Sequence, residues 1–173
     1  PDEEASVKLD EIPFDFERRR LSVVVEAGAG ARLITKGAPE AVLERCGEYE
    51  IAGERRILDA PARRRCQATF EELSRQGYRV LAVAERTLGR RTVYGAADER
   101  DLVLAGFVTF VDPPMPGVAD ALRALRRDGV TVKILTGDNE LVARHVCSQV
   151  ELDGERIVLG DELAQMTDGA LAA

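Results

Sequence analysis

Two short segments of this chain combine residue types that handle phosphate in many enzymes. Residues 136–139, Thr-Gly-Asp-Asn, follow an apolar run and precede a helical pattern. A hydroxyl, a glycine and a carboxylate at a strand end lie where the next helix directs its free N–H groups, so phosphate and Mg²⁺ are usually handled there. Residues 35–40, Thr-Lys-Gly-Ala-Pro-Glu, also join a strand to a helix, with Pro39 suited to the first helical turn. The two segments together predict a nucleotide site to which two modules contribute.

Length and composition are those of a globular protein with an aliphatic core. The 173 residues can bury a core and hold one large or two small domains, and 45% of them are apolar, with no Trp. The net charge of −7 argues against nucleic acid as a partner, because binding a phosphodiester backbone needs a basic face. The longest apolar run, residues 102–111, is about half of a membrane span, so we expect a soluble chain.

Apolar periodicity predicts the elements that must position the first segment. Strands over residues 21–26 and 31–35 flank a flexible hairpin turn, and a helix over 38–46 follows. A short strand pair comes next, and then a helix that begins at an Asp59 N-cap and ends at Gly77. Two further strands are expected over 78–87 and 102–111. The prediction for residues 1–112 is therefore an α+β domain with an antiparallel sheet and flanking helices.

The character of the chain changes at residues 112–116, Asp-Pro-Pro-Met-Pro. Prolines cannot continue a central strand, so we place a domain boundary after Asp112. Beyond it, helices over 118–127 and 141–150 alternate with strands over 130–135 and 157–159, which predicts part of a parallel α/β layer. Such a sheet needs neighbours on both sides. Residues 113–173 are therefore expected to be an incomplete domain, in a chain cut from a larger protein.

Five motifs resemble, in order and rough spacing, the cytoplasmic half of the P-type ATPases. They begin at Phe14, Lys36, Arg79, Asp112 and Thr136: Phe-Asp-Phe with Arg18 and Ser22-Val23, Lys-Gly-Ala-Pro-Glu, Arg-Val-Leu-Ala-Val-Ala, Asp-Pro-Pro, and Thr-Gly-Asp-Asn. The likeness covers nearly the whole chain. Residues 10–24 and 132–138 are most similar to the bacterial magnesium-transporting branch.

The resemblance implies a nucleotide-binding domain, lacking its first part, over residues 1–112. It implies that an aromatic side chain stacks on adenine, that a lysine lines the pocket, that a Gly-Ala pair lets backbone approach the base, and that an arginine reaches the phosphates. A second arginine is a further candidate for a phosphate contact. The aromatic residue is Phe16, the lysine is Lys36, and the Gly-Ala pair is Gly37 and Ala38. The first arginine is Arg79 and the second is Arg18.

The resemblance also implies a fragment of the haloacid-dehalogenase-like phosphorylation domain over residues 113–173. There Thr136, Gly137 and Asp138 match the loop that meets the γ-phosphate, and Asp112 matches a hinge carboxylate. The implied ligands are ATP and, with it, Mg²⁺ in the full-length enzyme; we expect no protein-held metal here. The aspartate nucleophile of an Asp-Lys-Thr-Gly-Thr segment is not among these residues. The isolated chain is therefore expected to be catalytically inactive.

Each singled-out side chain also has an ordinary structural interpretation. Phe16 alone would more often be a core residue, and Lys36 alone a solvated lysine. Arg79 fits equally well as an outward polar position in an apolar strand. Asp138 fits a helix N-cap, where aspartate is favoured.

The resulting hypothesis is the ATP-binding cytoplasmic part of a cation-transporting P-type ATPase of a bacterial inner membrane, and the transported ion is expected to be magnesium. Its expected partners are ATP and the rest of the same polypeptide: the actuator, the remaining phosphorylation domain and the membrane helices. Two alternatives remain at this point. A haloacid-dehalogenase-type phosphatase would share the Thr-Gly-Asp segment but leave Lys-Gly-Ala-Pro-Glu unexplained. A non-catalytic nucleotide-binding module would keep a pocket without chemistry.

Overall fold

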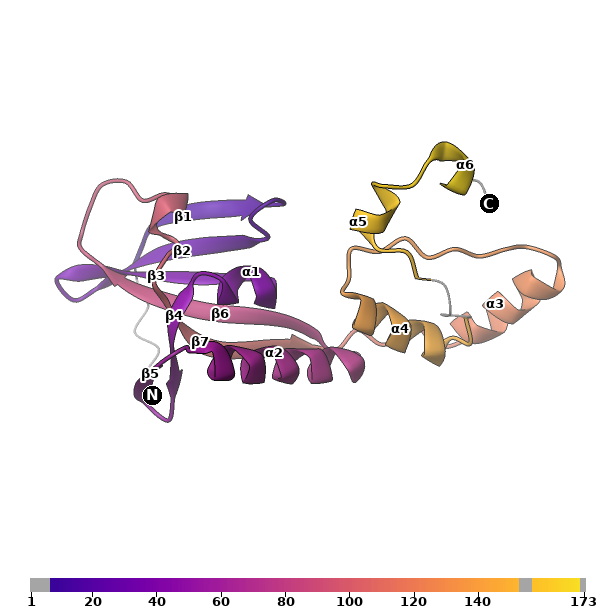
Figure 1. Ribbon diagram of the computed structural model, residues 1–173, viewed down its shortest axis with the longest axis horizontal. Helices are drawn as coiled ribbons and strands as arrows, with labels where there is room; N and C mark the ends of the chain where they lie inside the picture. The colour runs from indigo at the N-terminus through magenta and orange to yellow at the C-terminus, as the bar shows by residue number, and fades with distance from the viewer. Residues whose placement is uncertain (1–6, 153–156, 172–173) are drawn as a thin grey trace. The chain divides into compact units, whose positions relative to one another are not determined.

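The computed structural model describes residues 7–152 and 157–171, and it has a mixed α/β fold (Figure 1). The chain divides into two compact units. The first holds the described residues up to Glu72 together with Val80–Phe110, and the second holds Leu73–Arg79 and the described residues from Val111 onward. The mixed α/β class agrees with the sequence prediction. No helix among the described residues is long and apolar enough to cross a membrane.

The first unit is built on a sheet of seven strands in the order β1-β2-β3-β6-β7-β4-β5. β1 pairs with β2, β2 with β3, β3 with β6 and β4 with β5 in antiparallel fashion, whereas β4 and β7 are parallel. The strands are Lys8–Asp15 (β1), Arg20–Ala27 (β2), Gly30–Gly37 (β3), Cys46–Ile51 (β4), Glu54–Ile57 (β5), Arg79–Leu88 (β6) and Leu102–Phe110 (β7).

One face of this sheet carries the core of the unit. Alternation along β3 buries Ala31, Leu33 and Thr35, whereas the residues between them are exposed. The helices α1 (Pro39–Leu43) and α2 (Ala60–Arg75) contribute Val42, Leu43, Ala62 and Phe70 to the same core cluster. The opposite face of β3 is therefore open to solvent at Arg32, Ile34 and Lys36.

Local sequence signals account for most of these elements. The predicted hairpin forms, with Gly28 in the left-handed region at φ 57°. Asp59 Oδ1 accepts the N–H of Ala62 at 2.8 Å, which is the expected cap of α2. The helix expected over residues 38–46 is shorter, because Cys46 joins β4 and pairs with Leu102 of β7.

From Val111 onward, the described residues of the second unit form helices but no strand. They are α3 (Val118–Arg127), α4 (Glu140–Gln149), α5 (Gly160–Leu163) and α6 (Asp168–Leu171). The predicted strands over 130–135 and 157–159 do not form. Residues 130–135 are not part of the sheet found in the described chain, and Leu135 is 95% exposed, so their backbone lacks a sheet partner. The strand prediction was wrong for this chain.

The turn between β1 and β2 packs tightly against the end of β3. Ala38 N–H donates to the carbonyl of Arg19 at 3.0 Å, and Arg19 itself adopts a left-handed φ of 49°. A Cβ on Gly37 would lie 2.4 Å from Arg19 O and 2.6 Å from Arg20 Cβ. Only glycine fits this close approach without moving the turn.

We therefore predict that Gly37→Ala lowers the free energy of unfolding by about 1–3 kcal/mol, because the new methyl group meets backbone that cannot move aside cheaply. Urea denaturation followed by circular dichroism measures the change. Gly47→Ala is the matched control, since nothing lies within 4 Å of its Cβ position. Equal stability of the two variants would contradict the proposed packing role.

Candidate functional site

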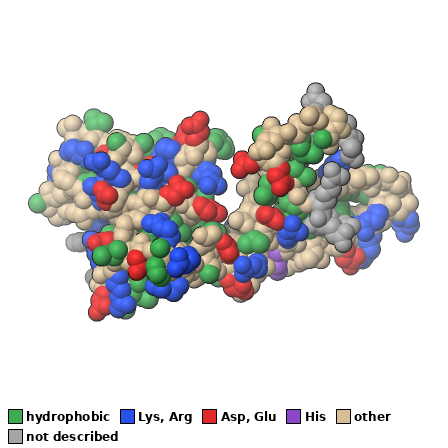
Figure 2. Space-filling model, in the orientation of Figure 1, with side chains coloured by type: hydrophobic (Ala, Val, Ile, Leu, Met, Phe, Trp, Pro, Cys, Tyr) green, Lys and Arg blue, Asp and Glu red, His purple; other side chains and the backbone are tan. Residues whose placement is uncertain are grey.

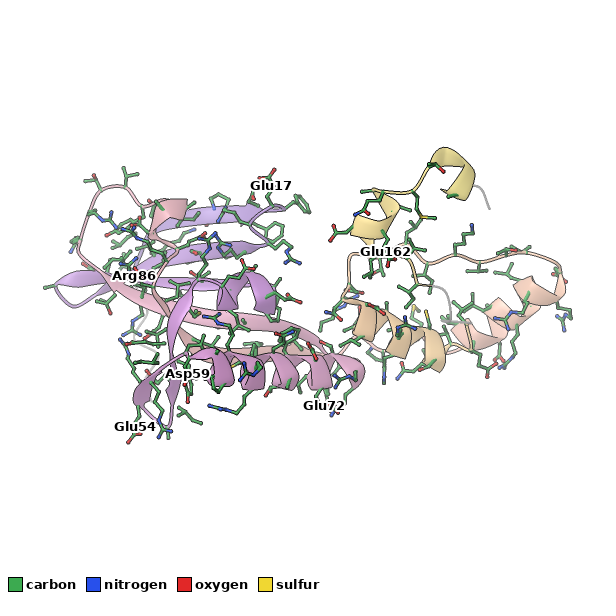
Figure 3. The ribbon with its side chains drawn as sticks, viewed as in Figure 1. Glu17, Glu54, Asp59, Glu72, Arg86 and Glu162 are labelled. Carbon is green, nitrogen blue, oxygen red and sulfur yellow. The ribbon has the colours of Figure 1, made fainter. Side chains whose placement is uncertain are left out.

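The end of β1 and the turn after it present an exposed aromatic pair. Phe16 is 88% exposed and Phe14 is 51% exposed, which is unusual for side chains of this size. Their ring centroids lie 5.3 Å apart with an interplanar angle of 86°, an edge-to-face pair. Glu17, labelled in Figure 3, belongs to the same turn. Phe16 is therefore free to offer a ring face to a planar ligand.

Lys36 lies on the solvent-open face of β3, one residue before its end. In the strand register Lys36 stands opposite Leu21 of β2 and Val83 of β6, both half-buried. Directly opposed residues share a face, so the two apolar side chains flank the lysine. Lys36 has no ion-pair or hydrogen-bond partner for its ammonium group in the described chain. An unpaired ammonium beside apolar surface suits a ligand with both a planar ring and phosphate.

The contact between Arg19 and Ala38 brings these two motifs to one end of the sheet. The turn that carries Phe16 and the segment that carries Lys36, Gly37 and Ala38 are joined by the hydrogen bond described above. Two residue groups predicted from separate motifs thus meet in the first unit. Leu21, Val83 and Phe14 were not predicted as site residues. The alternation of the strands was the signal that could have revealed the first two.

Arg18, a further candidate for a phosphate contact, is bound to a buried carboxylate. Its Nη1 donates to both Oε1 and Oε2 of Glu99 at 2.8 Å, and its Nη2 donates to the Pro13 carbonyl at 2.6 Å. Its side chain is only 22% exposed. Whether Arg18 also contacts a phosphate stays a prediction. In this structure its guanidinium holds the β1–β2 turn.

Glu99 is the centre of a buried polar network that sequence reasoning missed. Its side chain is 0% exposed. Oε2 accepts the Nε–H of Arg20 and Oε1 accepts the hydroxyl of Ser22, both at 2.8 Å. The Ser22 hydroxyl also lies 2.8 Å from that of Thr35 on the neighbouring strand. No local sequence pattern signals this burial, because the arginines precede Glu99 by about eighty residues.

The backbone around Glu99 is fixed independently. Arg86 of β6, labelled in Figure 3, donates to the carbonyls on either side of it, at 3.3 Å to Asp98 and 2.9 Å to Arg100. Asp98 belongs to the short 3-10 helix η1 (Ala96–Asp98) and accepts from Arg91 at 2.7 Å and from the backbone of Gly95 at 3.0 Å. The hydrogen bond from Arg91 contributes most to lowering the pKa of Asp98 from its ordinary value, and the one from Gly95 lowers it further.

Within the second unit, three residues predicted from separate motifs come together. Arg79 Nη1 lies 3.2 Å from Asp112 Oδ2, and its Nη2 lies 3.0 Å from Asp138 Oδ2. The Thr136 hydroxyl accepts the backbone N–H of Asp138 at 3.0 Å, which shapes the Thr-Gly-Asp segment around Gly137. The N-cap of α4 is Asn139, whose side chain accepts from Leu141. Asp138 is therefore not the N-cap and is left to pair with Arg79.

Charge on the first unit is interspersed. Figure 2 shows Lys and Arg side chains alternating with Asp and Glu over the visible face, without a continuous basic surface. Among the described residues, no group of three or more His, Cys, Asp or Glu side chains could hold a metal ion.

Comparison with known proteins identifies the family. Residues 3–117 match the family model described as "P-type ATPase, cytoplasmic domain N". The chain is 46% identical over 168 residues to "Magnesium-transporting ATPase, P-type 1" of Salmonella typhimurium, and 47% identical over 167 residues to the protein of that name from Escherichia coli K12. It is 29% identical over 171 residues to "Calcium-transporting ATPase 1" of Lactococcus lactis.

These alignments cover 96%, 95% and 97% of this chain but only 19%, 19% and 20% of the relatives. The chain thus spans about a fifth of the length of these curated relatives. It belongs to the P-type ATPase family and includes the cytoplasmic N domain of that family. The relatives with 46% and 47% identity carry a magnesium-transporting name.

The pairing of Arg79 with Asp138 leads to a stability prediction. Asp138→Asn should change the free energy of unfolding by less than about 1 kcal/mol, because the two side chains are 49% and 28% exposed and solvent screens their attraction. Chemical denaturation of the second unit, followed by amide NMR signals of α4, measures this. Asp120→Asn on α3 is the control exposed carboxylate. A loss of several kcal/mol in the free energy of unfolding would contradict this prediction, because it would show that Asp138 stabilises the fold.

Proposed function

We propose that this chain is the ATP-holding cytoplasmic part of a magnesium-transporting P-type ATPase of a bacterial inner membrane. In this proposal residues 1–112 form the nucleotide-binding domain without its first part, and residues 113–173 form a fragment of the phosphorylation domain. Family membership and the relatives' names support the assignment. The observation that carries it furthest is the hydrogen bond from Ala38 to Arg19, which joins the turn of Phe16 to the end of β3 that bears Lys36.

The donor set at this end of the sheet fits an adenine nucleotide. The exposed ring of Phe16 would stack on the base, and a flat aromatic accepts a base without further shape requirements. The ammonium of Lys36 would complement the phosphates, since it lacks a partner in the described chain. Gly37 and Ala38 would bring backbone close to the base. We assign Phe14, Leu21 and Val83 to the apolar surround of the same site.

The second unit is assigned to the phosphate side of the reaction. We propose that its helices belong to a parallel, haloacid-dehalogenase-like layer whose strands come from elsewhere in the parent polypeptide. Exposed apolar residues in 130–135, such as Ile134 and Leu135, support this, because a neighbouring strand and helix would cover them. Thr136, Gly137 and Asp138 would face the γ-phosphate only after domain closure in the parent enzyme brings ATP to them. Arg79 would contact phosphate in exchange for its two carboxylate partners, and Asp112 would lie at the hinge.

ATP, with its Mg²⁺, supplies the phosphoryl group that passes to an aspartate of the parent enzyme. The present residues would bind and orient the nucleotide, because the attacking carboxylate must stand in line with the γ-phosphate. Its Asp-Lys-Thr-Gly-Thr segment is not part of these 173 residues. The actuator, the rest of the phosphorylation domain and the membrane helices are the proposed partners. This division separates binding from chemistry within one polypeptide.

We predict saturable binding of ATP that weakens by about fivefold or more in Phe16→Ala, since base stacking on an aromatic contributes about 1–3 kcal/mol. Lys36→Ala should weaken binding similarly by removing a charge-assisted contact. Isothermal titration calorimetry measures both. Ile57→Ala, an exposed apolar side chain on β5, and Arg32→Ala, on the same strand and face as Lys36, are the matched controls. Equal losses in the controls would refute this placement of the site.

We further predict that the chain neither hydrolyses ATP nor becomes phosphorylated in the presence of Mg²⁺. Incubation with γ-labelled ATP, followed by acid quench and hydroxylamine treatment, measures any acyl-phosphate. The expected result is label at the level of a buffer control. A stoichiometric, hydroxylamine-sensitive adduct on Asp112 or Asp138 would place the chain with the phosphatases. Binding without any adduct leaves the proposed division of roles intact.

A further inference from the structure

We propose that Glu99 is a positioning residue for the nucleotide site, acting through the β1–β2 turn without touching the ligand; this inference rests on the proposed function. Glu99 has no exposed side-chain surface, so a bound nucleotide cannot reach it. Its two carboxylate oxygens are nevertheless shared between Arg18 and Arg20, the residues on either side of Arg19. The carboxylate thus holds the base of the turn that presents Phe16.

The hydrogen bonds form a continuous path from the carboxylate to the site. Arg18 fixes the turn to the end of β1 by donating to the Pro13 carbonyl at 2.6 Å, and its own backbone N–H donates to Asp15 Oδ1 at 2.8 Å. Arg20 closes the other side by donating to the Arg18 carbonyl at 3.0 Å. With both flanks fixed, the left-handed Arg19 directs its carbonyl at Ala38.

The path is anchored in the body of the unit. Arg86 fixes the backbone on both sides of Glu99, and Ser22 ties the carboxylate to the core face of β2. No buried side-chain nitrogen or oxygen in the described chain lacks a hydrogen-bond partner. A fully satisfied network of this kind holds one geometry, because each alternative leaves a buried charge unpaired. The Phe16 side chain is exposed, but the buried hydrogen-bond network of Glu99 fixes the turn that carries it.

The test compares ATP and AMP titrations of four proteins: the unchanged chain, Glu99→Gln, Phe16→Ala and the double variant. We expect Glu99→Gln to weaken the binding of ATP and of AMP equally, by about tenfold. The substitution loosens the turn that carries Phe16 and leaves the phosphate contacts in place. In the Phe16→Ala background the same change should have little further effect. Equal losses in both backgrounds would overturn the proposal, since Glu99 would then not act through Phe16.

Arg18→Lys separates this role from a direct phosphate contact and serves if Glu99→Gln does not fold. Lysine keeps the charge but loses the planar guanidinium, whose two terminal nitrogens reach Glu99 and the Pro13 carbonyl separately. We expect Arg18→Lys to weaken the binding of ATP and of AMP by the same factor. A loss several times larger for ATP would make Arg18 a phosphate ligand and contradict the proposal.

Two further measurements distinguish positioning from general destabilisation and from failure of the proposed function. Phe70→Leu, in the core on α2, is the control for destabilisation, and it should leave nucleotide affinity unchanged well below its melting temperature. Amide hydrogen exchange without nucleotide should speed up at residues 16–19 in Glu99→Gln and Arg18→Lys but not in Phe70→Leu. Unchanged exchange at the turn would refute positioning. If the unchanged chain bound no ATP but exchange responded as expected, the proposed function alone would fail.

Discussion

The first unit depends on the pairing of one buried carboxylate with two arginines. Removing Glu99 from water is costly unless its oxygens find donors, and the structure supplies them from Arg18, Arg20 and Ser22. All three donors lie within five residues at the start of β2 and the turn before it. The carboxylate therefore determines where the first hairpin stands relative to the connection between β6 and β7.

The same constraint explains the glycine of the Lys-Gly-Ala-Pro-Glu motif. Arg20 stands opposite Gly37 in the strand register, so the arginine that reaches Glu99 also brings the turn onto that glycine. A side chain at residue 37 would displace the Arg19 carbonyl and with it the hydrogen bond to Ala38. Motif residues that resemble a ligand-binding set thus also have a packing function. One residue can have both functions, because the backbone against which it packs also forms the site.

Sequence patterns predicted the parts of this structure whose causes are local. The β2–β3 hairpin, the Asp59 cap of α2 and the span of α3 follow from alternation, side-chain capping and helical periodicity. The role of Glu99 could not be predicted, since it lies in a polar connection and its partners are distant in sequence. The strand over 130–135 was predicted but does not form, because a strand also requires a neighbour. Phe16, Lys36, Gly37 and Ala38 could be singled out, whereas their joining through Arg19 required the structure.

The central claim is that ATP binds where the β1–β2 turn meets the end of β3. Two-dimensional amide NMR of the isotope-labelled chain during ATP titration tests it directly, since each residue reports separately. We predict saturable shifts concentrated in residues 14–21, 34–38 and 81–83, with at most small shifts in residues 136–139. Absence of shifts in the first three segments, or shifts confined to residues 136–139, would contradict it.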